Sequence, residues 1–183
     1  MSTDVLKAMA HPVRRELLAA LRHLGAGRAA DLAAALGEPA NRLSFHLRVL
    51  ADAGLIEEAP ELARDKRDRV WRPVRGGLTL GSPEDPVKDR ELGDAVLAGL
   101  VADDHRLLDR VAAWAPRYTS GEDPVIRGAM EAHSLRLTRE RFEELASRVD
   151  AVIEEFRADE EQHGTEDEVH GWQVLVIAAS EEI

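Results

Sequence analysis

The sequence of 183 residues lacks several features that would define whole classes of protein. It contains no cysteine, which excludes disulfide bonds and thiolate metal sites. No segment approaches the roughly 20 apolar residues that span a bilayer. The N-terminus lacks the charged-then-apolar pattern of a secretory signal. We therefore expect a cytoplasmic protein without a membrane segment.

Signatures of catalysis are also missing. The sequence has no nucleophile elbow, no phosphate-binding loop, no H-E-x-x-H motif and no conspicuous acid/base pair. One alternative is His105 beside Asp103 or Asp104, which could act in an enzyme or bind zinc if a partner chain added ligands. Exposure to solvent is the simpler interpretation of His105, as it is of His163 and His170. We predict no enzymatic activity, no cofactor and no metal site.

The charge is unevenly distributed along the chain. The net charge is −11, yet residues 1–76 contain 13 Lys and Arg against 10 Asp and Glu, which gives +3. The remaining residues contain 11 against 25, which gives −14. The two parts are therefore electrostatically different modules, and only the first is a candidate for nucleic acid.

Leucine spacing and helix-breaking residues predict three short helices before residue 37. Thr3 or Asp4 can cap the first, and Pro12 suits the first turn of the second because its missing N–H would be unpaired there anyway. Gly25 ends the second helix, and residues 28–36 form the third. Short amphipathic helices cannot bury their apolar faces alone, so these must pack on one another.

A fourth helix follows Pro39 and ends before Gly54. Leu43, Leu47 and Leu50 recur at helical spacing and predict a face directed into a core. The opposite face and its flanks carry groups able to meet base edges and phosphates. These are Asn41, Arg42, Ser44, Phe45 and Arg48.

Two short strands are predicted after this helix, over residues 55–59 and 69–74. The loop between them is rich in cations, and a helix followed by a positively charged hairpin is typical of a winged helix-turn-helix. The candidate phosphate contacts of this wing are Arg64, Lys66, Arg67 and Arg69. Asp65 and Asp68 interrupt the cluster, so an ordinary solvated charge cluster is the alternative.

The motif S-x-H-L-x-x-L-x-x-A-G-L, which runs from Ser44 to Leu55, resembles that of ArsR-type winged-helix transcriptional regulators. His11-Pro12, the run R-E-L-L from Arg15 and the Leu36-Gly37 pair extend the resemblance over residues 3–75. It implies a homodimeric bacterial regulator, usually a repressor, whose recognition helices enter successive major grooves. Pro39 and Ala40 depart from the family's usual cap and Gln, and no cysteine-containing metal motif is present.

The roles of the helix residues follow from this resemblance and from their chemistry. We expect Asn41, Arg42, Ser44 and Phe45 to read bases, and Arg48 to hold the DNA backbone. A large apolar side chain on a solvated face needs a reason. A thymine methyl would give Phe45 one, and packing on a neighbouring segment is the alternative. His46 is interpreted as a satisfied structural histidine.

The second half predicts two longer helices. One starts at Pro86 and ends before Pro116. The other is capped by Thr138 and carries apolar residues at spacings of 3, 4, 3 and 4, which is a heptad seam. The seam pairs either within the chain or across a dimer axis. The predicted dimerisation residues are Leu92, Val96, Leu100, Phe142, Leu145, Val149, Val152 and Phe156.

Residues 172–179 form a continuous apolar, β-branched run and predict a buried strand. Its candidate partners are residues 78–80 or the region near Val125 and Ile126. This half could also enclose a pocket for a small-molecule effector, although core packing is the simpler role for its bulky residues. These are Trp114, Tyr118, Met130 and Trp172.

Together these patterns predict a mainly α fold with a small β component. A winged helix-turn-helix domain over residues 1–76 is followed by a linker at 77–85. Residues 86–183 form an acidic helical region for dimerisation and a possible effector, ending in a β-strand. The predicted function is that of a homodimeric DNA-binding regulator that acts as a repressor on a pseudo-palindromic operator. The alternative is a winged-helix module that binds another protein.

Overall fold

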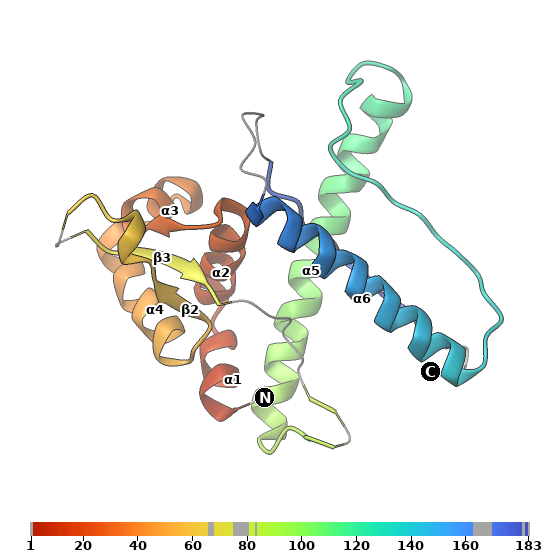
Figure 1. Ribbon diagram of the computed structural model, residues 1–183, viewed down its shortest axis with the longest axis horizontal. Helices are drawn as coiled ribbons and strands as arrows, with labels where there is room; N and C mark the ends of the chain where they lie inside the picture. Colours follow the sequence, from red (N-terminus) through yellow and green to blue (C-terminus); the bar gives the residue numbers. More distant parts are fainter. Residues whose placement is uncertain are drawn as a thin grey trace. The chain divides into compact units, whose positions relative to one another are not determined.

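The computed structural model describes residues 2–65, 68–74, 81–82, 84–162, 170–180 and 182 (Figure 1). Its internal contacts divide the chain into two units. The first unit comprises residues 1–110 with 171–183, and the second comprises residues 111–170. The predicted linker at residues 77–85 falls mostly outside the described residues.

Four helices form the N-terminal part of the first unit, as the leucine spacing predicts. They are α1 (Thr3–Met9), α2 (Pro12–Leu24), α3 (Ala29–Leu36) and α4 (Ala40–Asp52). Pro12 occupies the first turn of α2, and Gly37 ends α3 with a φ of 68°, a left-handed conformation that glycine adopts without strain. The cap of α1 differs from the prediction. The Ser2 side chain accepts the N–H of Val5 at 3.3 Å, because the helix begins at Thr3, one residue earlier than a Thr3 cap would allow and two earlier than an Asp4 cap would.

A small antiparallel sheet accompanies these helices, with strand order β1-β3-β2. The strands β2 (Ile56–Glu58) and β3 (Val70–Pro73) confirm the predicted hairpin, and the loop between them contains the 3-10 helix η1 (Pro60–Leu62). The strand β1 (Gly27–Arg28) was not predicted, because two residues are too few to show a period of two. It pairs Gly27 with Trp71 and thereby ties the start of α3 to the wing.

The core of the first unit is built mainly from leucine. Helix α4 contributes the three leucines that its periodicity predicted, and Ile56 and Trp71 close the core from the sheet. The fully buried leucines, with at most 2% of their surface exposed, are Leu6, Leu17, Leu18, Leu21, Leu32, Leu43, Leu47 and Leu50. Figure 1 shows the helices gathered around the sheet.

The helix α5 (Arg90–Thr119) is part of this core through its first turns. Val96 is 0% exposed, and Leu92 and Leu100 pack against the core beside it. These three predicted dimerisation residues therefore pack within the chain. Their role in dimerisation stays a prediction, and their burial leaves them little surface for a partner.

Both ends of α5 differ from the prediction. The helix starts at Arg90 instead of Pro86, where Asp89 accepts the N–H of Leu92 at 3.0 Å and acts as the cap. It also continues past Pro116 to Thr119. A proline removes its own N–H donor and crowds the carbonyl four residues before it. The turn after Pro116 is nevertheless kept by the N–H of Ser120, which donates to the Pro116 carbonyl at 3.0 Å.

The second unit contains the end of α5 and the helix α6 (Arg139–Gln162). The predicted cap of α6 is present, since the Thr138 hydroxyl accepts the N–H of Arg141 at 3.3 Å. Among the described residues, no helix is long and apolar enough to cross a membrane.

The predicted strand at residues 172–179 is absent. The segment has no regular structure, and Val174 and Ile177 are 68% and 75% exposed. A strand needs a partner to hydrogen-bond its backbone. One proposed partner, residues 78–80, lies outside the described residues, and the region near Val125 and Ile126 forms no strand.

Candidate nucleic-acid interface

The α4 helix separates its two faces sharply. Leu43, Leu47 and Leu50 are 0% exposed, whereas Phe45, two residues along from Leu43, is 63% exposed. The remaining predicted contacts on this helix are exposed or half-buried, and they are Asn41, Arg42, Ser44 and Arg48. The periodicity therefore placed each side chain on its observed face.

Polar groups at the start of α4 are partly engaged. The Arg42 guanidinium donates to Glu38 at 3.1 Å, and the Asn41 side chain accepts the Arg42 N–H at 2.9 Å. The Ser44 hydroxyl donates to the Ala40 carbonyl at 3.0 Å. With its hydrogen used in this way, Ser44 is left with acceptor capacity. Arg42 keeps most of its side chain in solvent, at 67% exposed, and can exchange Glu38 for another anion.

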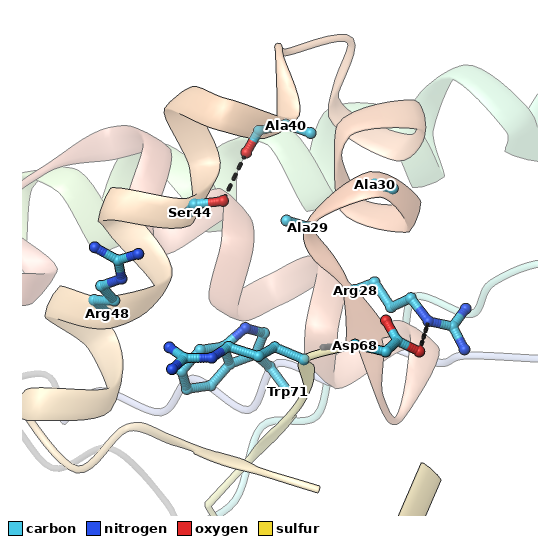
Figure 2. A pocket seen from close by; sticks show the side chains of 9 residues that line it. Arg28, Ala29, Ala30, Ala40, Ser44, Arg48, Asp68 and Trp71 are labelled. Atoms are coloured by element: carbon cyan, nitrogen blue, oxygen red, sulfur yellow. Dashed lines mark hydrogen bonds and ion pairs between the residues drawn. The ribbon is translucent and has the colours of Figure 1, made fainter. Parts of the chain in front are cut away.

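A groove of about 390 Å³ runs beside this helix (Figure 2). Its walls come from the start of α3, from α4 and from β3 with the residues before it. The lining includes three small alanine side chains, three arginines and Trp71. The lining residues are Arg28, Ala29, Ala30, Ala40, Ser44, Arg48, Asp68, Arg69 and Trp71.

One acidic residue lies in this groove. The Arg28 guanidinium donates to Asp68 at 2.7 Å, and the backbone N–H of Arg64 donates to the same carboxylate oxygen at 3.0 Å. The Arg64 N–H and then the Arg28 side chain lower the pKa of Asp68, so this carboxylate stays ionised. Asp68 thereby neutralises part of the charge of Arg28 and joins the residues before β3 to the start of α3.

The wing cations lie among acidic residues of β2 and η1. Arg69 pairs with Glu58 at 3.4 Å, and Arg72 pairs with Glu57 at 2.8 Å and with Glu61 at 2.5 Å. Arg64 is exposed, and Lys66 and Arg67 lie outside the described residues. The wing arginines of the described chain are therefore less available to phosphates than their sequence cluster alone suggested.

Behind α4, two imidazoles are in contact. The ring centroids of His11 and His46 are 4.6 Å apart, and His46 is 9% exposed. Burial lowers the pKa of both histidines, and neighbouring positive charges, including Arg14 and Arg42, lower it further. His46 was expected to be satisfied, but its Nδ1 and that of His11 are buried without a hydrogen-bond partner among the described residues. His46 of α4 thus packs on His11, in a setting that favours the neutral form of both imidazoles.

Asp103, one of the candidate enzymatic residues, is engaged in two ion pairs. Asp103 accepts a hydrogen bond from the nearly buried Arg15 at 2.9 Å and from Arg106 at 2.6 Å, whereas His105 is exposed. Among the described residues, no group of three or more His, Cys, Asp or Glu could hold a metal ion. Asp103 instead fastens α5 to α2.

The bulky residues considered for an effector pocket differ in their exposure. Trp114 and Tyr118 are in ring contact at 4.9 Å, and the Trp114 Nε1 is buried without a hydrogen-bond partner among the described residues. Met130 and Trp172 are 68% and 60% exposed. An effector site in this half stays a prediction.

Sequence reasoning did not single out the part of the groove that α3 supplies. Arg28 and the pair Ala29-Ala30 precede the fourth helix by ten residues or more, so only the fold brings them beside Ser44 and Arg48. The alanine-rich start of α3 was the available sign of this part of the groove, because small side chains permit close approach of a ligand.

Comparison with known proteins gives two matches. Residues 9–59 match the family model of a helix-turn-helix domain. Among solved structures, the crystal structure of the AntR antimony-specific transcriptional repressor is similar to this chain, with 27% sequence identity and a TM-score of 0.37. The alignment covers 57% of this chain and 78% of that one. No curated protein sequence matches the chain.

Proposed function

We propose that this chain, a DNA-binding regulator with an N-terminal winged helix-turn-helix domain of the ArsR type, acts as a homodimeric repressor on a pseudo-palindromic operator. The observation that carries the proposal is the outward face of α4. It presents an amide, two guanidinium groups and a phenyl ring to solvent on a helix whose other face is fully buried. A helix that exposes side chains able to contact base edges is suited to the major groove.

In this proposal the helix reads the bases and the groove beside it holds the backbone. Asn41 and Arg42 lie in the first turn of α4, where recognition helices contact base edges. Ser44 accepts a hydrogen bond, and Phe45 contacts a thymine methyl. Arg48 lies further along the helix, at the groove that Arg28 and Arg69 also line, and it meets a phosphate.

The wing supplies further phosphate contacts through Arg64, Lys66, Arg67 and Arg69, as expected from the sequence. To contact a phosphate, Arg69 must break its exposed ion pair with Glu58. An exposed ion pair at 3.4 Å contributes little stability, so this exchange costs little. Arg28 is a weaker candidate because Asp68 holds it at 2.7 Å.

The homodimer places two such helices on one face of the DNA. Half-sites about 34–36 Å apart, or a multiple of that, match one turn of the double helix. The acidic second half stays away from the phosphates and joins the two copies.

The test is a fluorescence anisotropy titration of the full chain against its own upstream DNA and a scrambled duplex, at two salt concentrations. We expect tight, salt-dependent binding to the native fragment and binding at least about 10³-fold weaker to the scrambled one. Equal weak binding to both would contradict operator reading by the free protein. Binding that ignores salt and needs no DNA would favour the protein-interaction module.

Single variants separate the proposed roles. Arg48→Ala should weaken binding to both duplexes and reduce the salt slope by about one phosphate contact. Asn41→Ala should weaken binding to the native fragment alone, by about 1–3 kcal/mol. Arg90→Ala is the matched control, because this arginine is 92% exposed at the start of α5 and outside the proposed interface.

A further inference from the structure

His46 lies at the border between the buried and the exposed face of α4. Its ring is 9% exposed and lies 4.6 Å from the ring of His11, the residue before α2. The same His46 ring contacts Phe45 edge-on, with ring centroids 5.5 Å apart and an interplanar angle of 71°. Phe45 is 63% exposed, and an edge-to-face contact favours one position for its ring. The buried histidine pair therefore touches a proposed base-reading side chain.

The contact between the two histidines suits neutral rings only. The Nδ1 atoms of His11 and His46 are buried without a hydrogen-bond partner among the described residues. An imidazolium carries a hydrogen on both ring nitrogens, so a proton taken from solvent leaves an N–H donor at Nδ1 without an acceptor. A buried charge that lacks such a partner is costly. A charged ring is therefore unstable in this contact.

The charged side chains around the pair do not offset an added proton. Burial is the largest cause that lowers the pKa of both histidines, and three arginines lower the pKa further. Two carboxylates raise it, but Glu38 is already paired with Arg42 at 3.1 Å and Glu16 is exposed. The charged groups that act on the pair are Arg14, Arg15 and Glu16 of α2, Arg42 of α4 and Glu38 before it.

The elements packed against α2 and α4 carry further charged side chains. Those of α1 are exposed to solvent, and Asp31 of α3 accepts a backbone N–H at the start of its own helix. Asp103 of α5 pairs with a guanidinium of α2, and Arg72 of β3 pairs with Glu57. Within the described part of the chain, none of these groups accepts a hydrogen bond from the Nδ1 of either histidine.

We propose that His11 and His46 position Phe45 for base reading and release it when the pair takes up a proton. They are positioning residues, because they act on the DNA through Phe45. A proton from solvent drives the two rings apart, since neither charged ring finds an acceptor in the contact. His46 then leaves the place where the Phe45 ring packs against it. This inference rests on the proposed operator binding and adds a proton-dependent regulation of it.

The pair couples operator affinity to pH with a definite sign. Operator binding requires both rings to be neutral, so it releases any proton that the free chain holds there. Below the folded pKa values, each such proton costs about tenfold in affinity per pH unit. The general effect of acid has the opposite sign, because a chain of net charge −11 becomes less negative and is attracted more strongly to phosphates. A scrambled duplex reports that general effect alone.

The test is an anisotropy titration of the full chain against its upstream DNA and the scrambled duplex, between about pH 7.5 and about pH 5.0. Circular dichroism in the same buffers identifies the pH values at which the chain stays folded. Over these values we expect the affinity for the native fragment to fall by at least about tenfold, while that for the scrambled duplex stays constant or rises. Parallel changes for both duplexes, or a loss that follows unfolding, overturn the inference. The absence of specific binding at the upper pH contradicts the proposed function instead.

Variants of the pair and of its target separate positioning from other acid effects. His11→Asn removes one ring and keeps the cap of α2, because asparagine is a favourable N-cap residue. Its amide oxygen can accept a hydrogen bond from a protonated His46, so this variant should lose less operator affinity in acid. Phe45→Ala removes the ring that the pair positions and should also flatten the pH profile. His23→Asn, at an exposed histidine of α2, is the matched control. A Phe45→Ala profile as steep as that of the wild type overturns the inference.

Nuclear magnetic resonance gives a readout that needs no DNA. The isotope-labelled full chain is followed over the same pH range, and the missing signal in Phe45→Ala identifies this ring among the three phenylalanines. We expect the nuclear Overhauser contact between the rings of Phe45 and His46 to weaken at the pH where His46 titrates. A contact that persists while His46 becomes protonated overturns the inference, whatever the outcome of the DNA titrations.

Discussion

The two units of the chain differ most in how they bury apolar surface. All fifteen buried apolar side chains of the described residues lie between Leu6 and Val96. Among the described residues from 111 to 158, none is buried. The helices of the first unit are held by a shared core, while α6 shows intrahelical ion pairs, such as those of Glu144 with Arg141 and Arg148.

This difference indicates that the helices of the two units are stabilised in different ways. A helix without tertiary contacts is marginally stable in water, and ion pairs three or four residues apart contribute only about 0.2–0.5 kcal/mol each. The first unit buries its leucines within the chain, whereas none of the α6 residues whose burial is described, up to residue 158, is buried. The predictions below test this contrast, from the largest effect to the smallest.

The largest difference is expected between matched truncations in the two units. Leu47→Ala removes a fully buried side chain from α4 and should lower the free energy of unfolding by about 2–5 kcal/mol. Val152→Ala, at 52% exposed on α6, should cost less than about 0.5 kcal/mol at protein concentrations too low for association. Urea unfolding followed by circular dichroism measures both. Similar costs for the two would remove the contrast.

A smaller loss is expected from Asp103→Asn. Arg15 is 9% exposed and donates to Asp103 at 2.9 Å and to the Met9 carbonyl at 3.0 Å. Loss of the carboxylate leaves a buried guanidinium without its counter-charge, at a cost of about 1–3 kcal/mol. Asp109→Asn, on the exposed surface of the same helix, is the control. Equal unfolding midpoints for the two variants would show that Arg15 does not depend on Asp103.

Acidification should weaken the first unit through the two contacting histidines. The pKa of His11 and that of His46 lie below their ordinary 6.5 in the folded chain, mainly because of burial. Around these pKa values the folded state therefore binds fewer protons than the unfolded state. The contribution of the two histidines to the unfolding free energy is complete above pH 6.5. It is lost as the pH falls below 6.5 and through the folded pKa values.

The measurement is the unfolding free energy at pH 7.5 and at pH 5.5. His46→Asn should reduce the difference between the two values, and the exposed His23→Asn should leave it unchanged. An unaltered pH dependence in His46→Asn would show that the histidine pair is not the cause.

The smallest effect on stability is expected at Phe45, on the same helix as Leu47. Phe45→Ala removes a ring that is 63% exposed and should change the unfolding free energy by no more than about 0.5 kcal/mol. Its affinity for an operator should nevertheless fall by about 1 kcal/mol if the ring contacts a thymine methyl. Anisotropy titration beside urea unfolding separates the two. A large loss of stability would assign Phe45 to packing instead.

Local patterns allowed much of the first unit to be predicted. Leucine spacing and helix-breaking residues predicted α1 to α4, and two short strands around a cation-rich loop predicted the hairpin of β2 and β3. The exposed face of α4 followed from the same period. The base-reading and phosphate-binding roles of its residues stay predictions.

What the sequence missed depended on distant partners. The strand β1 exists because Trp71 and Val70 lie beside Gly27 and Arg28. The run at residues 172–179 has the composition of a strand but pairs with none among the described residues. Composition favours a strand only where an edge is available to complete its hydrogen bonds.

The sequence by itself determined the winged helix-turn-helix fold, because helix periods and turn residues act over a few residues at a time. Only the tertiary structure decided that Val96 completes the N-terminal core and that Asp103 pairs with Arg15. It also decided that Arg28 and Arg48 share one groove. Such contacts join residues tens of positions apart. The local spacing of apolar residues shows that a helix has an apolar face, but it does not show which other element packs against that face.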